Sequence, residues 1–328
     1  PAGSALMEGL MKGLWLEDRK MTLRSDLPLP SLEAHEVLIK VLLAGVCSTD
    51  LEMVKGYYAF TGVPGHEFVG LVADDNGHPE LRGKRVIGDI NISCGKCERC
   101  LRQEPSQCMR RKTLGIFDYD GVFAEYCKLP AKNLTVVPDE VSDVLAVSTE
   151  PTAAALRILD QVQVKPSDRV IVVGAGRLGL LIAQVLKNTG CDLKVVVRRQ
   201  EPAAILAGWG IRAVYAEQIK GELADIVVEV TGSPEVFALS RSLTRARGTL
   251  VLKSTFAGDV SLNLSKLVVD EITLVGSRCG NYPAGLRALS SGLVQVGEMV
   301  DSIYSLDQGL EAISRASQPG VLKVLIRT

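Results

Sequence analysis

The sequence of 328 residues is long enough for about two domains, and its 47% hydrophobic and 23% charged content is that of a globular protein. The 37 Lys and Arg residues offset the 38 Asp and Glu residues to a net charge of −1, which excludes a basic surface for nucleic acid and a polybasic membrane anchor. Apolar runs such as Val170–Val173 end long before the roughly 18 residues that a membrane span requires.

The N-terminal segment shows no secretory signal, because Glu8 and Lys12 interrupt its apolar run and no small-residue cleavage site follows. The sequence opens with Pro1, so we expect a processed, truncated or tagged product, and a removed transit peptide stays open. Four of the eight cysteines are clustered, as is usual for metal binding, and a chain of this size needs no disulfides. We therefore expect a reducing compartment, the cytoplasm.

The two halves of the chain differ in their patterns. The first predicts irregular β-structure, with strands at Val37–Leu42, Phe68–Ala73 and Lys84–Gly88. From about residue 165, helices at Arg177–Asn188 and Ala203–Trp209 alternate with apolar strands. These strands are Arg169–Val173, Leu193–Val197, Ala213–Tyr215, Asp225–Val230, Gly248–Lys253 and Ile272–Gly276. Repeated βα units with continuous apolar strands predict an α/β fold with a doubly wound parallel sheet.

A glycine loop joins the first of these strands to its helix. Gly174 allows a tight turn, Gly176 lets the backbone approach a pyrophosphate, and Gly179 allows close packing of helix and strand. Arg177 and Leu178 open the helix, whose N-terminus faces the anion. This context favours a dinucleotide site over a merely tight βα turn.

The end of the second strand predicts which dinucleotide binds. Arg198 and Arg199 occupy the position where an acidic residue would bind a ribose 2′-hydroxyl, and two guanidinium groups suit a 2′-phosphate. Glu201 lies too far into the next turn, and Asp192 lies at the wrong end of the strand. We expect NADP(H); NAD stays possible if both arginines are ordinary surface charges.

The clustered cysteines form a lobe near residues 91–110. Four thiolates with this spacing can close a tetrahedral shell around a structural zinc ion: Cys94, Cys97, Cys100 and Cys108. The alternatives are an iron–sulfur cluster, for which nothing else indicates electron transfer, and free buried cysteines.

A second group of potential ligands is dispersed along the chain. Cys47, His66 and Glu150 lie in Gly45-Val-Cys-Ser-Thr-Asp50, Gly65-His-Glu67 and Thr149-Glu-Pro151. Taken singly, they could be a buried small residue, a turn histidine and a helix-start carboxylate.

Together with the lobe and the glycine loop, these motifs resemble those of zinc-dependent members of the medium-chain dehydrogenase/reductase superfamily, the relatives of alcohol, sorbitol, threonine and glucose dehydrogenases. The resemblance runs from about Gly13 to the C-terminus, with the motifs in family order. It implies a GroES-like β-rich catalytic domain at residues 1–150, a Rossmann domain at 151–280, and a segment at 281–328 that returns to the catalytic domain.

The resemblance also implies roles for individual residues. Cys47, His66 and Glu150 would hold a catalytic zinc ion, so that two zinc ions bind per chain. Glu67 lies where relatives have a glutamate that can approach or replace a ligand. Asp50 would orient the His66 ring.

Three further roles concern the substrate and the cofactor. Thr49 would bind the substrate oxygen and begin a proton relay. The histidine that ends this relay in some alcohol dehydrogenases is absent, and whether Glu52 or bulk water replaces it is open. Lys323 falls where relatives place a cationic pyrophosphate contact.

The expected reaction is hydride transfer between NADP(H) and a small-molecule alcohol or carbonyl substrate, with zinc as a Lewis acid. An NADP-dependent sugar or polyol dehydrogenase is the alternative within enzymes, and a catalytically inactive nucleotide-binding protein is the alternative outside them. Zinc-free quinone reductases are disfavoured by the ligand residues.

Residues after Cys47 either line the substrate pocket or pack the core: Leu51, Met53, Tyr57, Tyr58 and Phe60. The resemblance implies pairing of the last strand, Glu271–Ser277, with a second copy, and therefore a homodimer or homotetramer.

Overall fold

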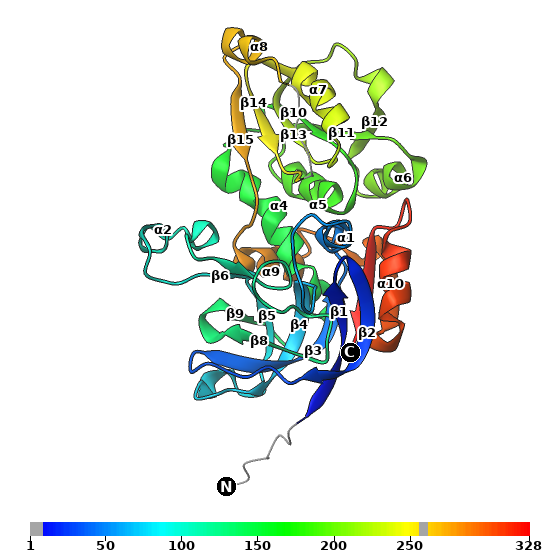
Figure 1. Ribbon diagram of the computed structural model, residues 1–328. Helices are drawn as coiled ribbons and strands as arrows, with labels where there is room; N and C mark the ends of the chain where they lie inside the picture. Colours follow the sequence, from blue (N-terminus) through cyan, green and yellow to red (C-terminus); the bar gives the residue numbers. More distant parts are fainter. Residues whose placement is uncertain (1–8, 256–261) are drawn as a thin grey trace. The chain divides into compact units, whose positions relative to one another are not determined.

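The computed structural model describes residues 9–255 and 262–328, and the chain divides into two compact units (Figure 1). The first unit comprises the described residues up to Thr149 together with Val300–Thr328, and the second comprises Glu150–Met299. The residues before Gly9, on which part of the secretory-signal prediction depends, lie outside the described part.

The first unit is built on a mixed sheet in which, among the described residues, seven strands take the order β16-β17-β3-β4-β5-β9, with β8 paired to β3. One face of its central strand is fully buried, because Val37, Ile39 and Val41 are inaccessible to solvent, whereas Lys40 on the other face is exposed. The strands of this sheet are β3 (Glu36–Gly45), β4 (Glu67–Asp74), β5 (Arg85–Gly88), β8 (Tyr126–Pro130), β9 (Leu134–Val136), β16 (Val300–Ser305) and β17 (Lys323–Arg327). The predicted strands at Val37–Leu42, Phe68–Ala73 and Lys84–Gly88 lie within or overlap β3, β4 and β5.

Shorter elements complete the first unit. A hairpin, an additional small ladder and several helices flank the sheet, and the last of the helices packs against β17. They are β1 (Leu10–Glu17), β2 (Lys20–Pro28), β6 (Asn91–Ile92), β7 (Lys112–Thr113), α1 (Ser48–Val54), α2 (Glu98–Leu101), α3 (Asp143–Val147) and α10 (Gly309–Ala316).

The second unit is a parallel sheet with the strand order β12-β11-β10-β13-β14-β15. This is the 3-2-1-4-5-6 order of the Rossmann fold, which the alternating pattern predicts. Its strands are β10 (Arg169–Val173), β11 (Asp192–Val197), β12 (Arg212–Tyr215), β13 (Ala224–Glu229), β14 (Thr244–Leu252) and β15 (Thr273–Gly276). Its helices are α4 (Thr149–Gln161, whose first residue belongs to the first unit), α5 (Arg177–Lys187), α6 (Gln200–Gly208), α7 (Pro234–Leu243), α8 (Leu264–Val269) and α9 (Tyr282–Ser290).

The second domain boundary differs from the prediction. The chain returns to the first unit at Val300 and not near residue 281, so that α9 stays with the Rossmann sheet. Two contacts keep it there. Gly280 packs so closely on α4 that a Cβ atom would overlap the carbonyl oxygen of Ala153. The Gln184 side chain of α5 exchanges hydrogen bonds of 2.9 and 2.7 Å with the backbone of Gln295.

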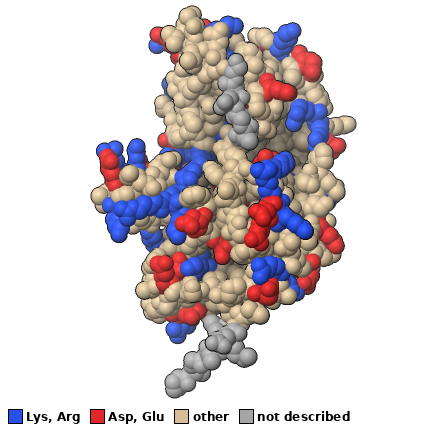
Figure 2. Space-filling model, in the orientation of Figure 1, with Lys and Arg blue, Asp and Glu red and all other residues tan. Residues whose placement is uncertain are grey.

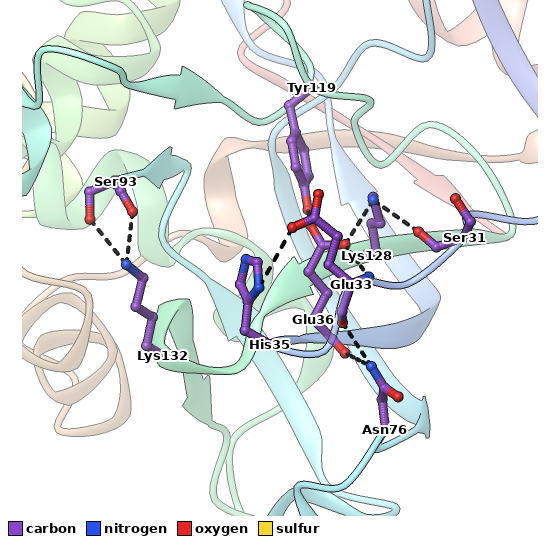
Figure 3. Close-up of polar contacts among 9 residues, drawn as sticks. All are labelled: Ser31, Glu33, His35, Glu36, Asn76, Ser93, Tyr119, Lys128 and Lys132. Carbon is purple, nitrogen blue, oxygen red and sulfur yellow. Dashed lines mark hydrogen bonds and ion pairs between the residues drawn. The ribbon is translucent and has the colours of Figure 1, made fainter. Parts of the chain in front are cut away.

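A buried carboxylate joins the sheet of the first unit to the loop at residues 114–121 (Figure 3). Glu36 at the start of β3 accepts hydrogen bonds from the Tyr119 hydroxyl at 2.5 Å and from the Lys128 ammonium of β8 at 2.7 Å. Burial by itself raises the pKa of Glu36, but these bonds outweigh it and lower that pKa below its usual value. The network therefore holds the loop against the sheet as long as Glu36 is ionised.

No helix within residues 9–255 and 262–328 has the length and apolar content needed to cross a bilayer. In Figure 2 acidic and basic side chains are scattered among residues of other kinds, and Lys and Arg gather around the lobe that contains α2.

Candidate active site and metal centres

The main candidate site lies where β3 ends and β4 begins. Antiparallel pairing sets Gly45 opposite Glu67, and this register brings Cys47, at the N-cap of α1, next to His66. The potential ligand atoms of Cys47, His66 and Glu67 all lie within 4.8 Å of one another. A thiolate, an imidazole nitrogen and a carboxylate oxygen at this spacing suit a zinc ion.

The Asp50 carboxylate lies next to the Nδ1 atom of the His66 ring. Its Oδ1 lies 3.2 Å from His66 Nδ1, and its Oδ2 accepts a hydrogen bond of 2.8 Å from the Cys47 backbone N–H. Asp50 is inaccessible to solvent and His66 is only 3% exposed. Burial lowers the pKa of His66, but the nearby charges of Asp50 and Cys47 outweigh it and raise that pKa well above its usual range. The groups around His66 thus favour a positive charge at its ring, which a divalent cation bound to the ring nitrogen would also supply.

Glu67 has a buried partner of its own. The Lys323 ammonium of β17 pairs with its Oε2, and both residues are almost fully buried. Gly45 makes room for this pair, since a Cβ atom there would lie 2.7 Å from Glu67 Oε2. The structure therefore places Lys323 beside a candidate metal ligand, whereas the prediction assigned it to the cofactor pyrophosphate.

The backbone before His66 is held by close packing. The carbonyl oxygen of Gly65 accepts a hydrogen bond of 3.1 Å from Val122 N–H, and a Cβ atom at Gly115 or Gly121 would overlap that oxygen. The Phe123 ring covers the other side, because a Cβ atom on Gly65 would lie 2.7 Å from it. The loop that Tyr119 ties to Glu36 thus fixes the position of His66.

The structure gives the other predicted catalytic residues different surroundings. Thr49 Oγ1 lies 3.8 Å from Cys47 Sγ, in the first turn of α1. The Glu52 carboxylate pairs with Lys55 at 2.7 Å on a partly exposed part of the same helix. Glu150 belongs to the second unit, in the first turn of α4, so its role as a zinc ligand stays a prediction.

The residues expected in either the pocket or the core divide between the two. Met53 is buried and packs, with Phe60, against Leu16 of the first unit. Tyr58 is 43% exposed and its ring meets that of Tyr57 edge-on at 4.5 Å. Met53 is therefore a core residue, whereas Leu51, Tyr57 and Phe60 are half-buried and Tyr58 is exposed.

The four-cysteine lobe forms a compact sulfur cluster. The Sγ–Sγ distances are 3.5 Å for Cys97 and Cys100, 3.8 Å for Cys97 and Cys108, and 4.0 Å for Cys94 and Cys100. Zinc–sulfur bonds of about 2.3 Å in a tetrahedron place sulfur atoms about 3.8 Å apart, so the lobe fits a closed zinc site. Backbone N–H groups, foremost that of Cys100, lower the pKa of Cys97 to about 6. The predicted lobe residues thus come together with the spacing that a structural ion needs.

The glycine loop has the geometry that a dinucleotide site needs. Gly174 has φ +117°, which disfavours any other residue, and a Cβ atom on Gly179 would overlap the carbonyl oxygen of Gly174. Gly176 is exposed and has open space where a side chain would stand, which leaves room for a pyrophosphate at the N-terminus of α5. Arg177 and Leu178 form the half-buried first turn of that helix.

Arg198 and Arg199 are both exposed in the turn between β11 and α6. This turn lies at the carboxyl end of the strand next to β10, where the adenosine ribose binds in Rossmann folds. Their guanidinium groups are therefore accessible to a ligand in the second unit.

Comparison with known proteins agrees with this geometry. Residues 33–139 match the model of the alcohol dehydrogenase GroES-like domain, and residues 178–291 match that of the zinc-binding dehydrogenase family. D-arabinitol dehydrogenase 1 of Uromyces fabae is 30% identical over 93% of each chain. The chain belongs to the zinc-dependent medium-chain dehydrogenase/reductase superfamily. It is accordingly an oxidoreductase that acts on CH–OH groups with a nicotinamide cofactor.

Solved structures of this superfamily share the whole fold. The structure of a short chain alcohol dehydrogenase from Escherichia coli CFT073, complexed with NADH, has a TM-score of 0.90 at 27% identity and covers 98% of this chain and 100% of that one. A structure from Sinorhizobium meliloti 1021, bound to NADP, has a TM-score of 0.89 at 26% identity with the same coverage. The predicted family, fold class and enzyme class are confirmed, while the choice between NADP and NAD is not made by these relatives.

Several residues of the site escaped the sequence analysis. Gly45, Gly115 and Gly121 make room for the Glu67 side chain and the Gly65 backbone, yet nothing in the sequence links these glycines to positions so far along the chain. The sequence offered only one hint of their importance, namely that glycines are frequent near the Cys47 and His66 motifs. Their function depends on which strands pair.

Proposed function

We propose that this protein transfers a hydride between NADP(H) and a secondary alcohol or the corresponding carbonyl compound. The observation that carries the proposal is the cluster of Cys47, His66 and Glu67 with Asp50 behind the histidine. Cys47 and His66 would hold a zinc ion, with Glu67 or Glu150 as the carboxylate ligand. The ion would supply Lewis acidity at the substrate oxygen, and the nicotinamide would give or accept the hydride.

The protein's own groups would position the reactants. Asp50, 3.2 Å from His66 Nδ1, would orient the ring and leave its other nitrogen to hold the zinc ion. The Thr49 hydroxyl would bond the substrate oxygen and carry its proton outward, a role supported by its position 3.8 Å from Cys47 Sγ. Glu52 pairs with Lys55, so bulk water is the simpler acceptor for that proton.

Specificity for NADP(H) would come from Arg198 and Arg199. Charge-assisted hydrogen bonds are worth about 1.5–3 kcal/mol each, so replacing both arginines by serine is expected to weaken NADPH binding roughly 100-fold or more. NADH binding, measured by fluorescence titration on the same variant, should change less than about twofold, since NADH lacks the 2′-phosphate. An equal loss for both dinucleotides would contradict the specificity.

A polyol dehydrogenase is the second candidate. It is favoured by the similarity to a protein named D-arabinitol dehydrogenase, while the exposed Tyr57–Tyr58 pair favours a less polar substrate. A coupled NADP(H) screen of pentitols, hexitols, simple secondary alcohols and aldehydes distinguishes them. Turnover of pentitols alone would replace the primary proposal with this one.

The first measurement is the zinc content of protein purified without added metal or chelator. A value near two per chain supports both the lobe and the Cys47 cluster. A value near one, with Cys47 open to alkylation, would leave only the lobe occupied. The inactive nucleotide-binding alternative would then replace the dehydrogenase.

A homodimer or homotetramer is proposed from an exposed apolar edge. β15 is the last strand of its sheet, and near it Leu264, Val268 and Val269 of α8 are 66–80% exposed, with Leu274 of β15 at 40%. Such an edge is protected when it pairs with a second copy. A monomeric mass by multi-angle light scattering at micromolar concentration would contradict this. We propose the cytoplasm as its location, because none of the eight cysteines forms a disulfide and cysteines that bind metal must stay reduced.

A further inference from the structure

Glu229 is a buried carboxylate of the second unit that neither the metal clusters nor the expected cofactor contacts include. It is the last residue of β13, where it pairs in register with Val173 of β10, and it is only 3% exposed. The strand order of the sheet reverses between β10 and β13, which is where Rossmann folds bind their dinucleotide. A carboxylate at this point is expected to repel a pyrophosphate, so its presence indicates a bonding role.

The Glu229 carboxylate is bonded to the turn that follows β13. Its Oε1 accepts a hydrogen bond of 2.7 Å from the Thr231 backbone N–H and one of 2.6 Å from the Thr231 hydroxyl. The oxygen of that hydroxyl in turn accepts a hydrogen bond of 3.1 Å from the Ser233 backbone N–H. A hydroxyl that donates to one group and accepts from another is held in one orientation, so these bonds fix the Thr231 side chain.

The methyl group of Thr231 packs on the glycine loop. A Cβ atom at Gly174 would lie 2.9 Å from Thr231 Cγ2 and 3.0 Å from the Val230 carbonyl oxygen. The Val230 backbone N–H also donates a hydrogen bond of 3.0 Å to the Val173 carbonyl oxygen, and a Cβ atom at Gly179 would lie 3.2 Å from Val230 Cγ1. The turn after β13 therefore supports the glycine loop at both of its ends.

The other side of the turn is tied to the residues that follow β14. The Lys253 backbone N–H donates a hydrogen bond of 3.0 Å to the Glu229 carbonyl oxygen, and the Gly232 N–H donates one of 2.7 Å to Ser254 Oγ. The turn is thus held on both sides, and the Glu229 side chain joins its beginning to its middle. Because Thr231 and Gly174 are in contact, a shift of the threonine would be transmitted to the glycine loop.

We propose that Glu229 is a positioning residue for the dinucleotide: by fixing the Thr231 side chain, it holds Gly174 and the N-terminus of α5 in the geometry that binds the pyrophosphate. Its role is that of a hydrogen-bond acceptor and not of a charge. A side chain of the same shape that accepts the same bonds should therefore replace it. The proposal rests on the proposed function, in which a dinucleotide binds at the glycine loop.

The test compares the Kd for NADPH and NADH of two variants by fluorescence titration. Glu229→Gln keeps the shape and an accepting Oε1, whereas Glu229→Met keeps the length and removes the acceptor. Glu229→Gln should weaken binding by no more than about threefold. Glu229→Met should weaken both dinucleotides equally, about 10-fold or more, because a displaced loop loses a charge-assisted hydrogen bond to the pyrophosphate that both contain. Glu298→Met, at an exposed glutamate of the same unit, serves as the matched control.

A fragment of the cofactor separates positioning from a general loosening of the unit. Adenosine 2′-phosphate lacks the pyrophosphate, so its Kd in Glu229→Met should stay within about twofold of the wild-type value. A loss for this fragment as large as that for NADPH would overturn the proposal. So would an unchanged NADPH affinity in Glu229→Met, or an equal loss in Glu229→Gln, which would assign the effect to the charge.

Thr231 offers a second pair of variants, which also serve if Glu229→Met does not fold. Thr231→Val keeps the shape and removes the hydroxyl, whereas Thr231→Ser keeps the hydroxyl and removes the methyl group that contacts Gly174. Each should weaken both dinucleotides a few-fold, and unchanged affinities in both would overturn the proposal. If Glu229 acts through Thr231, adding Thr231→Val to Glu229→Met should cause no further loss, and a fully additive double variant would contradict it.

The proposal and the proposed function fail in distinguishable ways. If the wild-type protein binds neither NADPH nor NADH, the proposed function is overturned, and the role of Glu229 with it. If the wild-type protein binds a dinucleotide and Glu229→Met binds it equally well, only the role of Glu229 is overturned.

Discussion

The two metal clusters of the first unit differ in how their donors are brought together. The lobe takes its four thiols from the segment between Cys94 and Cys108, and the Cys108 sulfur accepts hydrogen bonds from the backbone N–H groups of Cys94 and Arg110. The other cluster takes Cys47 from the end of one strand and His66 from the start of the next, and it is supported by β17 through Lys323. The lobe can therefore be formed locally, whereas the second cluster needs several elements to bring its buried donors together.

The electrostatics of the two clusters differ as well. The lobe has four chemically equal ligands near the surface and is closed once they bind an ion. At the other cluster Asp50, 3.2 Å from His66, brings an additional carboxylate, and Lys323 offsets the charge of Glu67. Catalytic zinc sites keep a position open for substrate, and mixed ligands supported by further polar groups suit that task.

The largest expected effect comes from removing Cys47. The Cys47→Ser variant should lose turnover by at least about 1,000-fold, because the metal supplies several kcal/mol of transition-state stabilisation. Zinc content should fall by one ion per chain, while NADPH binding and the lobe stay intact. Cys191→Ala, at a half-buried cysteine outside both clusters, is the matched control. Full activity in Cys47→Ser on an identified substrate would refute the catalytic role of this cluster.

The Asp50→Asn variant tests the dependence of the same cluster on its supporting carboxylate. Asparagine keeps the size of Asp50 but removes the charge that holds the His66 ring, so metal affinity and kcat/KM should each fall roughly 10- to 100-fold. Asp118→Asn, in an exposed ion pair with Lys112, is the control. Unchanged metal affinity in Asp50→Asn would show that packing alone orients the histidine.

The Cys97→Ser variant asks whether the lobe is independent of the reaction. It should lose one zinc ion and become open to proteolysis between residues 91 and 113, because the lobe then lacks its cross-link. Turnover per remaining zinc ion should change less than about fivefold, since none of the Cys47 cluster comes from this segment. A loss as large as that of Cys47→Ser would remove the distinction between the clusters.

The smallest effect is expected at Glu36, which supports the His66 backbone through Tyr119. The lowered pKa of Glu36 means that its contribution to stability is present above the unfolded value of about 4.3 and is lost as the pH falls through the folded value. Glu36→Gln should therefore lower the free energy of unfolding by about 1–3 kcal/mol at pH 7, with the difference closing below about pH 4. Urea unfolding at both pH values measures it.

The control for this effect is Glu33→Gln, since the Glu33 side chain is exposed near His35 (Figure 3). It should change the free energy of unfolding by no more than about 0.5 kcal/mol. A deficit in Glu36→Gln that is the same at both pH values would mean that shape, and not charge, explains its role.

The local motifs were predictable because their chemistry depends on near neighbours. The spacing of Cys94, Cys97, Cys100 and Cys108 predicts a closed cluster, since a short segment can bring four thiols together without any other part of the chain. Likewise Gly174, Gly176 and Gly179 predict a pyrophosphate loop, and the structure gives Gly174 the positive φ that this loop needs. The continuous apolar strands predict the Rossmann sheet, because both faces of such a strand must be covered.

The boundary near residue 281 and the surroundings of Lys323 were not predictable in the same way. The chain leaves the Rossmann unit only at Val300, because Gly280 and Gln295 pack on helices that come more than 100 residues earlier. Lys323 pairs with Glu67 because β17 lies beside β3, a register that no local pattern specifies.

Residue types at short spacing were enough to predict the family, the two kinds of domain, the lobe and the glycine loop. The three-dimensional structure was needed to show that Glu67 stands beside Cys47 and His66 and that Lys323 offsets its charge. The reason is physical: a buried charge is stable only with its partner in place, and strand pairing and helix packing select that partner across distant parts of the chain.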